Sequence, residues 1–134
     1  MNEPLEPAGW AKPIGYSNGR VVEAGRIVFV AGQVGWDARQ RFQSSDLADQ
    51  FEQALSNILE VLALAGGRAE HVCRMTAYCT DKAEYLAARQ RLGRAWQRLM
   101  GRHYPAMTMV FVSALLDEGA KIELEATAVV PNGR

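Results

Sequence analysis

The runs Tyr104–Leu115, YPAMTMVFVSAL, and Lys121–Val130, KIELEATAVV, decide the fold of this chain. In the second run apolar residues alternate with others, and successive side chains of a strand point to opposite faces, so this run predicts a strand with one face in a core. Glu123 and Glu125 then share the other face. The first run is apolar on both faces, which is typical of a strand covered on both sides. The predicted core face of the second run comprises Ile122, Leu124, Ala126, Ala128 and Val130.

Length and charge narrow the class of protein. A chain of 134 residues is one domain, and its 15 basic and 15 acidic residues cancel, so there is no overall positive field to bind nucleic acid. No apolar run approaches the ~20 residues that span a membrane. Residues 1–12 are predicted to be a flexible, proline-rich arm rather than a signal peptide, and residues 13–131 a single domain.

The two cysteines indicate a reducing compartment. Cys73 and Cys79 lie six residues apart on one predicted strand, which holds them too far apart for a disulfide. Reduced thiols predict a cytoplasmic protein.

The first half of the chain predicts a hairpin and a helix. Arg20–Glu23 and Arg26–Val30 are β-rich runs around a glycine, which favours a tight hairpin. Gly32 follows at once and lets a ligand or another backbone come close. A helix is expected from Ser45 or Asp46 to about Ala65.

The second half predicts a strand over Val72–Thr80, a helix from Asp81 to Gly101, and the two runs quoted first. The order β-β-α-β-α-β-β predicts an α+β fold in which two helices cover one face of a mixed sheet. The other face keeps apolar residues, which we expect to pack against further copies of the chain. These residues are Tyr78, Val110, Val112 and Ala114.

Several segments in this order resemble the Rid (YjgF) family of small imine and enamine deaminases. They are IGYSNG (Ile14–Gly19), VFVAGQV (Val28–Val34), YPA (Tyr104–Ala106) and IELEA (Ile122–Ala126). The resemblance implies the chorismate-mutase-like, or YjgF-like, fold. It also implies homotrimers whose sheets line a central barrel, small-molecule sites in the clefts between subunits, and no cofactor.

The resemblance also implies roles for residues of the site. Glu123 matches the glutamate thought to position the attacking water, and Tyr16 matches a tyrosine that covers the ligand. Backbone groups near Gly32 and at residues 107–109 would hold the ligand. From the residues alone, the spacing favours a solvated or salt-bridged strand glutamate for Glu123, because carboxylates are mostly exposed unless paired. Tyr16 fits a loop aromatic packed on the sheet equally well.

The chain departs from the family at the residue that binds the substrate carboxylate. Deaminating Rid proteins have an arginine where this chain has Met107, and its guanidinium holds the substrate carboxylate with two hydrogen bonds. Losing that contact removes on the order of 2–5 kcal/mol of recognition. Ala31 replaces a serine, Met109 a frequent cysteine, and Arg89 lies near an asparagine position, so the predicted site is more apolar.

Two interpretations follow. In the first, Arg89, Arg74 or His103 supplies the missing cation, although an ordinary surface charge is the commoner role for such residues. In the second, the methionines line a pocket for an apolar compound. The methionines are also consistent with plain core packing. Neither histidine has partners at zinc-ligand spacing, so no metal is expected.

Three functions therefore remain open from the sequence. The chain is an imine or enamine deaminase with altered specificity, a non-catalytic trimer that binds a small hydrophobic metabolite, or a structural or partner-binding trimer.

Overall fold

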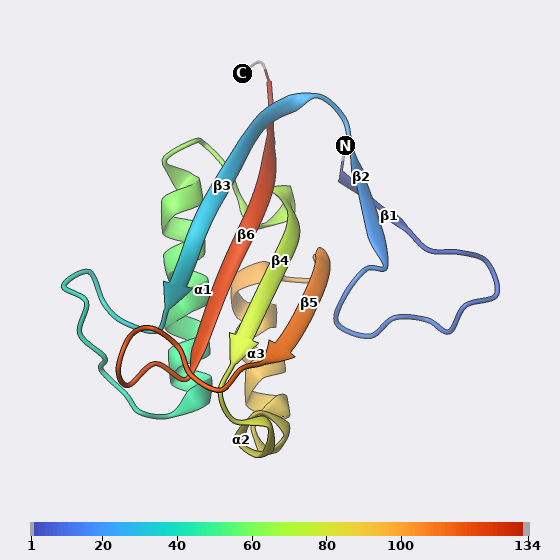
Figure 1. Ribbon diagram of the computed structural model, residues 1–134. Helices are drawn as coiled ribbons and strands as arrows, with labels where there is room; N and C mark the ends of the chain where they lie inside the picture. Colours follow the sequence, from blue (N-terminus) through green and yellow to red (C-terminus); the bar gives the residue numbers. More distant parts are fainter. Residues whose placement is uncertain (1, 133–134) are drawn as a thin grey trace.

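The main sheet of the protein has four strands, in the order β3-β6-β4-β5. The computed structural model describes residues 2–132 (Figure 1). The C-terminal strand β6 (Ile122–Pro131) lies between β3 (Gly25–Val34) and β4 (Val72–Cys79) and is antiparallel to both. β5 (Ala106–Phe111) runs parallel to β4 and forms one edge. The predicted mixed sheet is confirmed.

The predicted hairpin between the first two β-rich runs is wrong. β2 (Gly19–Val22) pairs with an additional strand, β1 (Asn2–Leu5), so part of the expected flexible arm is a strand. Gly25 does not sit in a turn: a Cβ there would lie 2.6 Å from the carbonyl oxygen of Val130. This glycine therefore serves the close approach of β3 to β6, and β2 leaves the main sheet. Figure 1 shows the β1–β2 ribbon projecting beside β5.

The first helix begins where the predicted capping residue places it. α1 (Leu47–Ala63) begins after Asp46, whose side chain accepts a hydrogen bond from the amide of Asp49. It is followed by Gly66 at φ 75°, the left-handed conformation that glycine adopts readily at a helix end. A 3-10 turn, η1 (Ala69–His71), then leads into β4.

The second predicted helix is two helices. α2 (Lys82–Ala87) is capped by the side chain of Asp81, as expected, and the chain bends at Ala88 before α3 (Arg89–Met100). Ala88 has φ −96° and ψ 4°, outside helical geometry. None of the helices within residues 2–132 combines the length and apolar character that crossing a bilayer requires.

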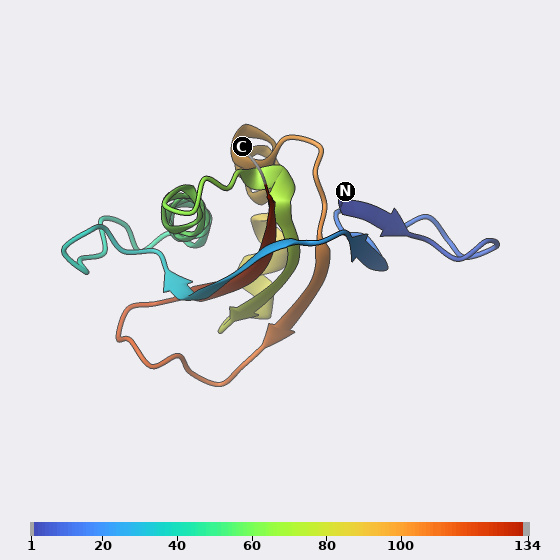
Figure 2. The same cartoon turned by 90° about the horizontal axis from the view of Figure 1, so that it is seen from above.

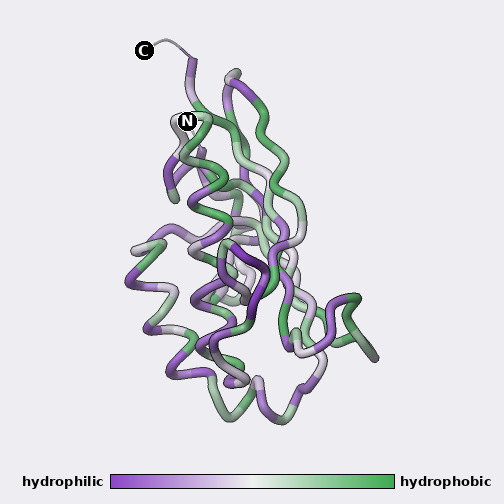
Figure 3. Tube along the Cα trace, turned by 90° about the vertical axis from the view of Figure 1, so that its left-hand side faces the viewer, coloured by the Kyte–Doolittle hydropathy of each residue, from purple (hydrophilic) through white to green (hydrophobic). Residues whose placement is uncertain are grey.

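The helices pack on one face of the sheet, and the hydrophobic core lies between the helices and the sheet (Figure 2). Purple and green segments alternate along the helical part of the tube in Figure 3, which fits helices that bury one side. On the other face Phe29 is 78% exposed, Ile27 61% and Val110 37%. β5 ends at Phe111, although the amide of Val112 still donates to the carbonyl oxygen of Cys79 at 2.9 Å, and Ala114 lies beyond the expected strand. The largest fully buried side chains include Leu47, Leu55, Ile58, Leu62, Met75, Ile122 and Leu124.

Arg20 joins the ribbon to the rest of the domain. Its guanidinium donates to the side-chain and backbone oxygens of Asn2, to Ser17 Oγ at 2.9 Å, and to the carbonyl oxygen of Tyr104 at 2.9 Å. Ser17 Oγ also donates to the Tyr104 carbonyl, at 2.6 Å. One side chain therefore holds the N-terminal strand, the segment before β2 and the entrance of β5 together.

We expect Arg20→Met to loosen these three segments at once. Because the substitution leaves several hydrogen-bonding oxygens without a charged donor, it should cost roughly 1.5–3 kcal/mol of unfolding free energy. Urea denaturation measures this loss, and hydrogen exchange should show faster exchange of the β1 and β2 amides. The matched control is Arg102→Met, which changes an exposed arginine outside this cluster. Equal stabilities of the two variants would contradict the assigned role.

Candidate active site

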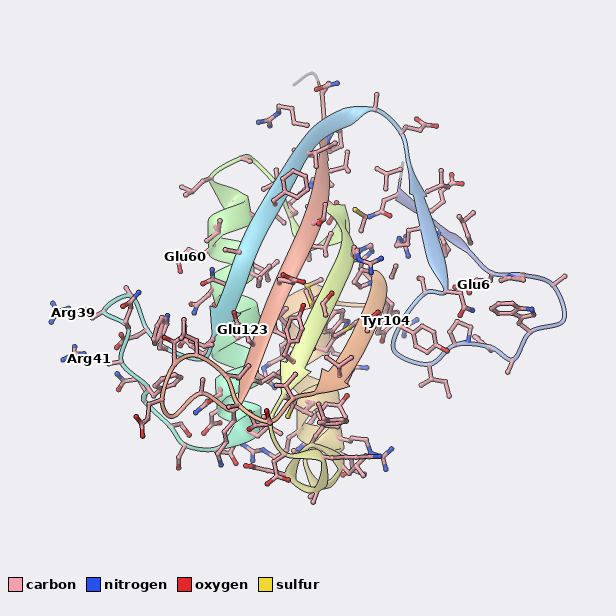
Figure 4. All side chains as sticks on the ribbon, in the orientation of Figure 1. Glu6, Arg39, Arg41, Glu60, Tyr104 and Glu123 are labelled. Carbon is pink, nitrogen blue, oxygen red and sulfur yellow. The ribbon has the colours of Figure 1, made fainter. Side chains whose placement is uncertain are left out.

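Glu123 projects from β6 onto the uncovered face of the sheet (Figure 4). Its neighbours across the sheet are Tyr78 on β4 and Val34 on β3. The register of β3 shifts between Val30 and Gln33, so a bulge at Gly32 locally interrupts the pairing with β6. A Cβ at Gly32 would lie 1.9 Å from Glu123 Oε2, so the glycine leaves the space that the carboxylate occupies.

The electrostatic environment of Glu123 disfavours its charge. Burial raises the pKa of this carboxyl above its ordinary value, and the negative charges of Asp117 and Glu125 raise the pKa further. Within residues 2–132 the carboxylate has no hydrogen bond or ion pair. Glu125 differs, because Tyr78 donates a hydrogen bond of 2.9 Å to its Oε2. Of these two neighbouring carboxylates, Glu123 is the one with both oxygens free for a water or a substrate.

A cavity of about 570 Å³ lies on the other side of the sheet, beside β5 and α3. Met107 and Met109 contribute to its wall, and Tyr85 and Arg89 line it from α2 and α3. The segment before β2 forms a further part of the wall through Ile14 and Gly15, because the amide of Ser17 donates to the carbonyl oxygen of Pro105 at 3.0 Å. We call this cavity the β5–α3 pocket.

The sheet separates Glu123 from the β5–α3 pocket within one chain. Met107 is paired with Met75, which is fully buried on the helix side. Glu123 is paired with Tyr78, on the opposite face. Ala31 also lies on the open face, in a groove of about 380 Å³ that Arg74 lines as well. The predicted residues therefore form two groups: Glu123, Ala31 and Gly32 on one face, and Met107, Met109 and Arg89 on the other.

The three candidate cations fall in different places. Arg89 lines the β5–α3 pocket with Met107, whereas Arg74 belongs to the groove on the open face. His103 Nε2 lies 2.6 Å from the carbonyl oxygen of Val72, at the start of β4. Arg89 is therefore the candidate that shares a cavity with Met107.

Tyr16 is 41% exposed and follows Gly15 of the pocket wall. The sequence prediction missed Gly93 and Arg94, which line the same pocket from α3. Gly93 stands four residues after Arg89, which puts these two positions on one side of a helix, and Arg94 follows directly. This spacing does not single them out until the neighbours on that side of α3 are known.

The comparisons with known proteins agree with this architecture. The family model for Endoribonuclease L-PSP matches residues 11–130. Protein DfrA of Myxococcus xanthus is 35% identical over 120 residues, covering 88% of each chain. The human 2-iminobutanoate/2-iminopropanoate deaminase is 28% identical over 115 residues, covering 85% of this chain and 79% of its own.

A solved structure shows the same fold. The Rid-family protein YyfB of Yersinia pestis superimposes with a TM-score of 0.85 at 30% identity, covering 96% of this chain and 98% of its own. The chain belongs to the Endoribonuclease L-PSP family, the Rid (YjgF) family of the sequence resemblance.

Glu123→Gln is expected to stabilise the protein at neutral pH. The pKa of Glu123 is higher in the folded chain than in the unfolded one, so ionisation destabilises the fold, and the amide removes that penalty. The gain should be under about 1 kcal/mol because solvent screens a partly exposed group. It should be absent below the ordinary glutamate pKa of about 4.3, grow as pH rises through the raised pKa, and stay constant above it.

Urea denaturation between pH 3.5 and 8 measures this difference. Glu60→Gln, a change at an exposed glutamate on α1, is the control. A loss of stability in Glu123→Gln at pH 7 would show that the carboxylate is held by a favourable contact.

Proposed function

We propose that this protein is a cytoplasmic deaminase that hydrolyses an imine or enamine and releases ammonia. The supporting observation is Glu123, a carboxylate with a raised pKa and unsatisfied oxygens on a partly buried strand. Membership of the family supports the reaction class, because the human relative is named an imine deaminase. The free thiols of Cys73 and Cys79 fit a reducing compartment.

In the proposed reaction, the water oxygen attacks the carbon of a protonated imine. Glu123 accepts a proton from this water as the new C–O bond forms. Glu123 then returns this proton to the nitrogen of the tetrahedral intermediate. As the C–N bond breaks, Glu123 takes the proton of the hydroxyl group, so that a carbonyl compound and ammonia form. The ammonia takes that proton and leaves as ammonium, which restores the carboxylate; one protonated imine and one water give one carbonyl compound and one ammonium ion.

The proposed site is shared between copies in a homotrimer. One chain holds Glu123 and the β5–α3 pocket on opposite faces of its sheet, so a ligand in the pocket does not reach that chain's own Glu123. The open face also leaves Phe29 and Ile27 exposed, and a second copy would cover them. The supporting geometry is this separation: the pocket of one copy would meet Glu123 of the next.

A second candidate function is binding without catalysis. Met107 and Met109 give the pocket an apolar wall, which suits a hydrophobic metabolite. Under this alternative, Glu123→Gln would leave ligand binding intact and there would be no turnover to lose.

The deaminase proposal predicts ammonia release from freshly generated imines. With imines produced in situ by an amino acid oxidase, the wild type should accelerate ammonia release, and Glu123→Gln should slow it about 100-fold or more. 2-Iminobutyrate serves as the aliphatic substrate, and Met107→Arg should increase its turnover by restoring a carboxylate contact. Equal rates with and without the protein for every imine tested would overturn the proposal.

The shared site predicts rescue between two inactive variants. Gly93→Phe should block the pocket with little damage to the core, because a Cβ at Gly93 meets no atom within 4 Å. Co-expressed with Glu123→Gln and assembled at random, it should restore about a quarter of the sites. Either variant expressed alone is the control. No recovery in mixed trimers whose composition is verified by mass spectrometry would argue that each site lies within one chain.

A further inference from the structure

The α3 helix carries four arginines, and they divide into two pairs. Arg91 forms ion pairs with Asp46 and Asp49 at 2.9 and 3.2 Å, and Arg98 pairs with Glu52 at 2.6 Å. The other two, Arg89 and Arg94, line the β5–α3 pocket.

Neither pocket arginine has a hydrogen bond or an ion pair among the described residues. Their guanidinium groups stay charged at any physiological pH and offer several donors in a planar fork. Arg94 also borders a small cavity that Asp49 and Glu52 line, whereas the β5–α3 pocket, which Arg89 lines, has no acidic side chain in its wall. An unpaired cation on the wall of such a pocket favours a ligand with an anionic group.

Between these arginines the helix has a glycine with no local reason to be one. Gly93 lies inside α3, where glycine is unfavourable compared with alanine. Its φ is not positive, and an added Cβ would meet no atom within 4 Å. Neither backbone conformation nor packing against the chain itself explains the residue. What the missing side chain does provide is open space on the pocket wall.

The remaining wall of the pocket suits a large apolar group. Met107 and Met109 belong to it, and Tyr85 and Trp96 add aromatic surface. A volume of about 570 Å³ is within the range of roughly 300–1,000 Å³ typical of sites that enclose drug-sized ligands. A ligand with a short aliphatic chain would leave much of this wall uncovered.

We infer that the β5–α3 pocket binds a carboxylate with an aromatic or similarly bulky apolar body. The carboxylate is held by Arg89, Arg94 adds positive charge to the same wall, and the body lies across Gly93 against the two methionines. This inference rests on the proposed function, since it assigns the substrate class of the same site: a 2-imino acid with an aromatic side chain. The cation that binds the carboxylate then comes from α3, whereas Met107 on β5 carries a thioether.

Binding of stable keto analogues tests the inference apart from turnover. Isothermal titration calorimetry should show that phenylpyruvate binds the wild type about tenfold or more tightly than phenylacetone, which lacks the carboxylate. It should also bind more tightly than 2-oxobutanoate, which lacks the aromatic body. Arg89→Met should weaken phenylpyruvate binding about tenfold or more and leave phenylacetone binding nearly unchanged. Arg102→Met, outside the pocket, is the matched control and should behave as wild type.

Gly93 gives a second test with two readouts. Gly93→Leu should raise the melting temperature, because leucine favours a helix, and should weaken phenylpyruvate binding about tenfold or more because it fills the pocket. Undiminished binding in this variant or in Arg89→Met would overturn the inference. So would phenylacetone or 2-oxobutanoate binding as tightly as phenylpyruvate, or no phenylpyruvate binding at all.

The two proposals fail in different measurements. Arg89-dependent phenylpyruvate binding without hydrolysis of any imine would refute the deaminase and leave the substrate class of the pocket supported. Hydrolysis of aliphatic imines together with phenylpyruvate binding that does not depend on Arg89 would refute the present inference and keep the deaminase. Glu123→Gln should retain phenylpyruvate binding, which separates the pocket from the catalytic group.

Discussion

The alternation of side chains along β6 is the constraint on which the rest of the structure depends. This strand lies inside the sheet, so one set of its side chains packs against the helices and the other set faces away. A shift of register by one residue would bury Glu123 and expose Leu124. The same alternation, carried through β4 to β5, puts Met107 on the helix side. The division of the site between two faces thus follows from strand geometry, and the proposed sharing between copies would bring the two parts together.

Much of the fold could be predicted because its signals are local. The period of β6 and the caps at Asp46 and Asp81 each depend on residues a few positions apart. The pairing of β2 could not be predicted in this way, because the Ala24-Gly25 signal says where a turn is possible and nothing about the partner strand. The bend at Ala88 also gave no warning, since alanine is a favourable helix residue.

The residues of the candidate site could be predicted from the sequence more readily than their positions relative to one another. Glu123 and Gly32 were singled out separately, and the structure shows that the glycine makes room for the carboxylate. The orientation of β5 was harder, because a strand that is apolar on both faces has no alternation to read. Its pairing with β4 decides that Met107 and Met109 turn towards α3. Arg94 and Gly93 become informative only when the neighbours on that side are known.

The central place of β6 also bears on how the chain is made. β3 and β4 are separated in the sheet by a strand that is translated after both of them. While the ribosome still holds residues 122–131, β3 lacks its partner, and the apolar sides of α1 and α3 have an incomplete sheet to cover. The nascent chain therefore exposes aggregation-prone apolar surface on an incomplete sheet until late in synthesis. A stop codon before this strand would leave β3 unpaired beside a two-stranded β4–β5 sheet, so such truncated products are targets for chaperones and proteases.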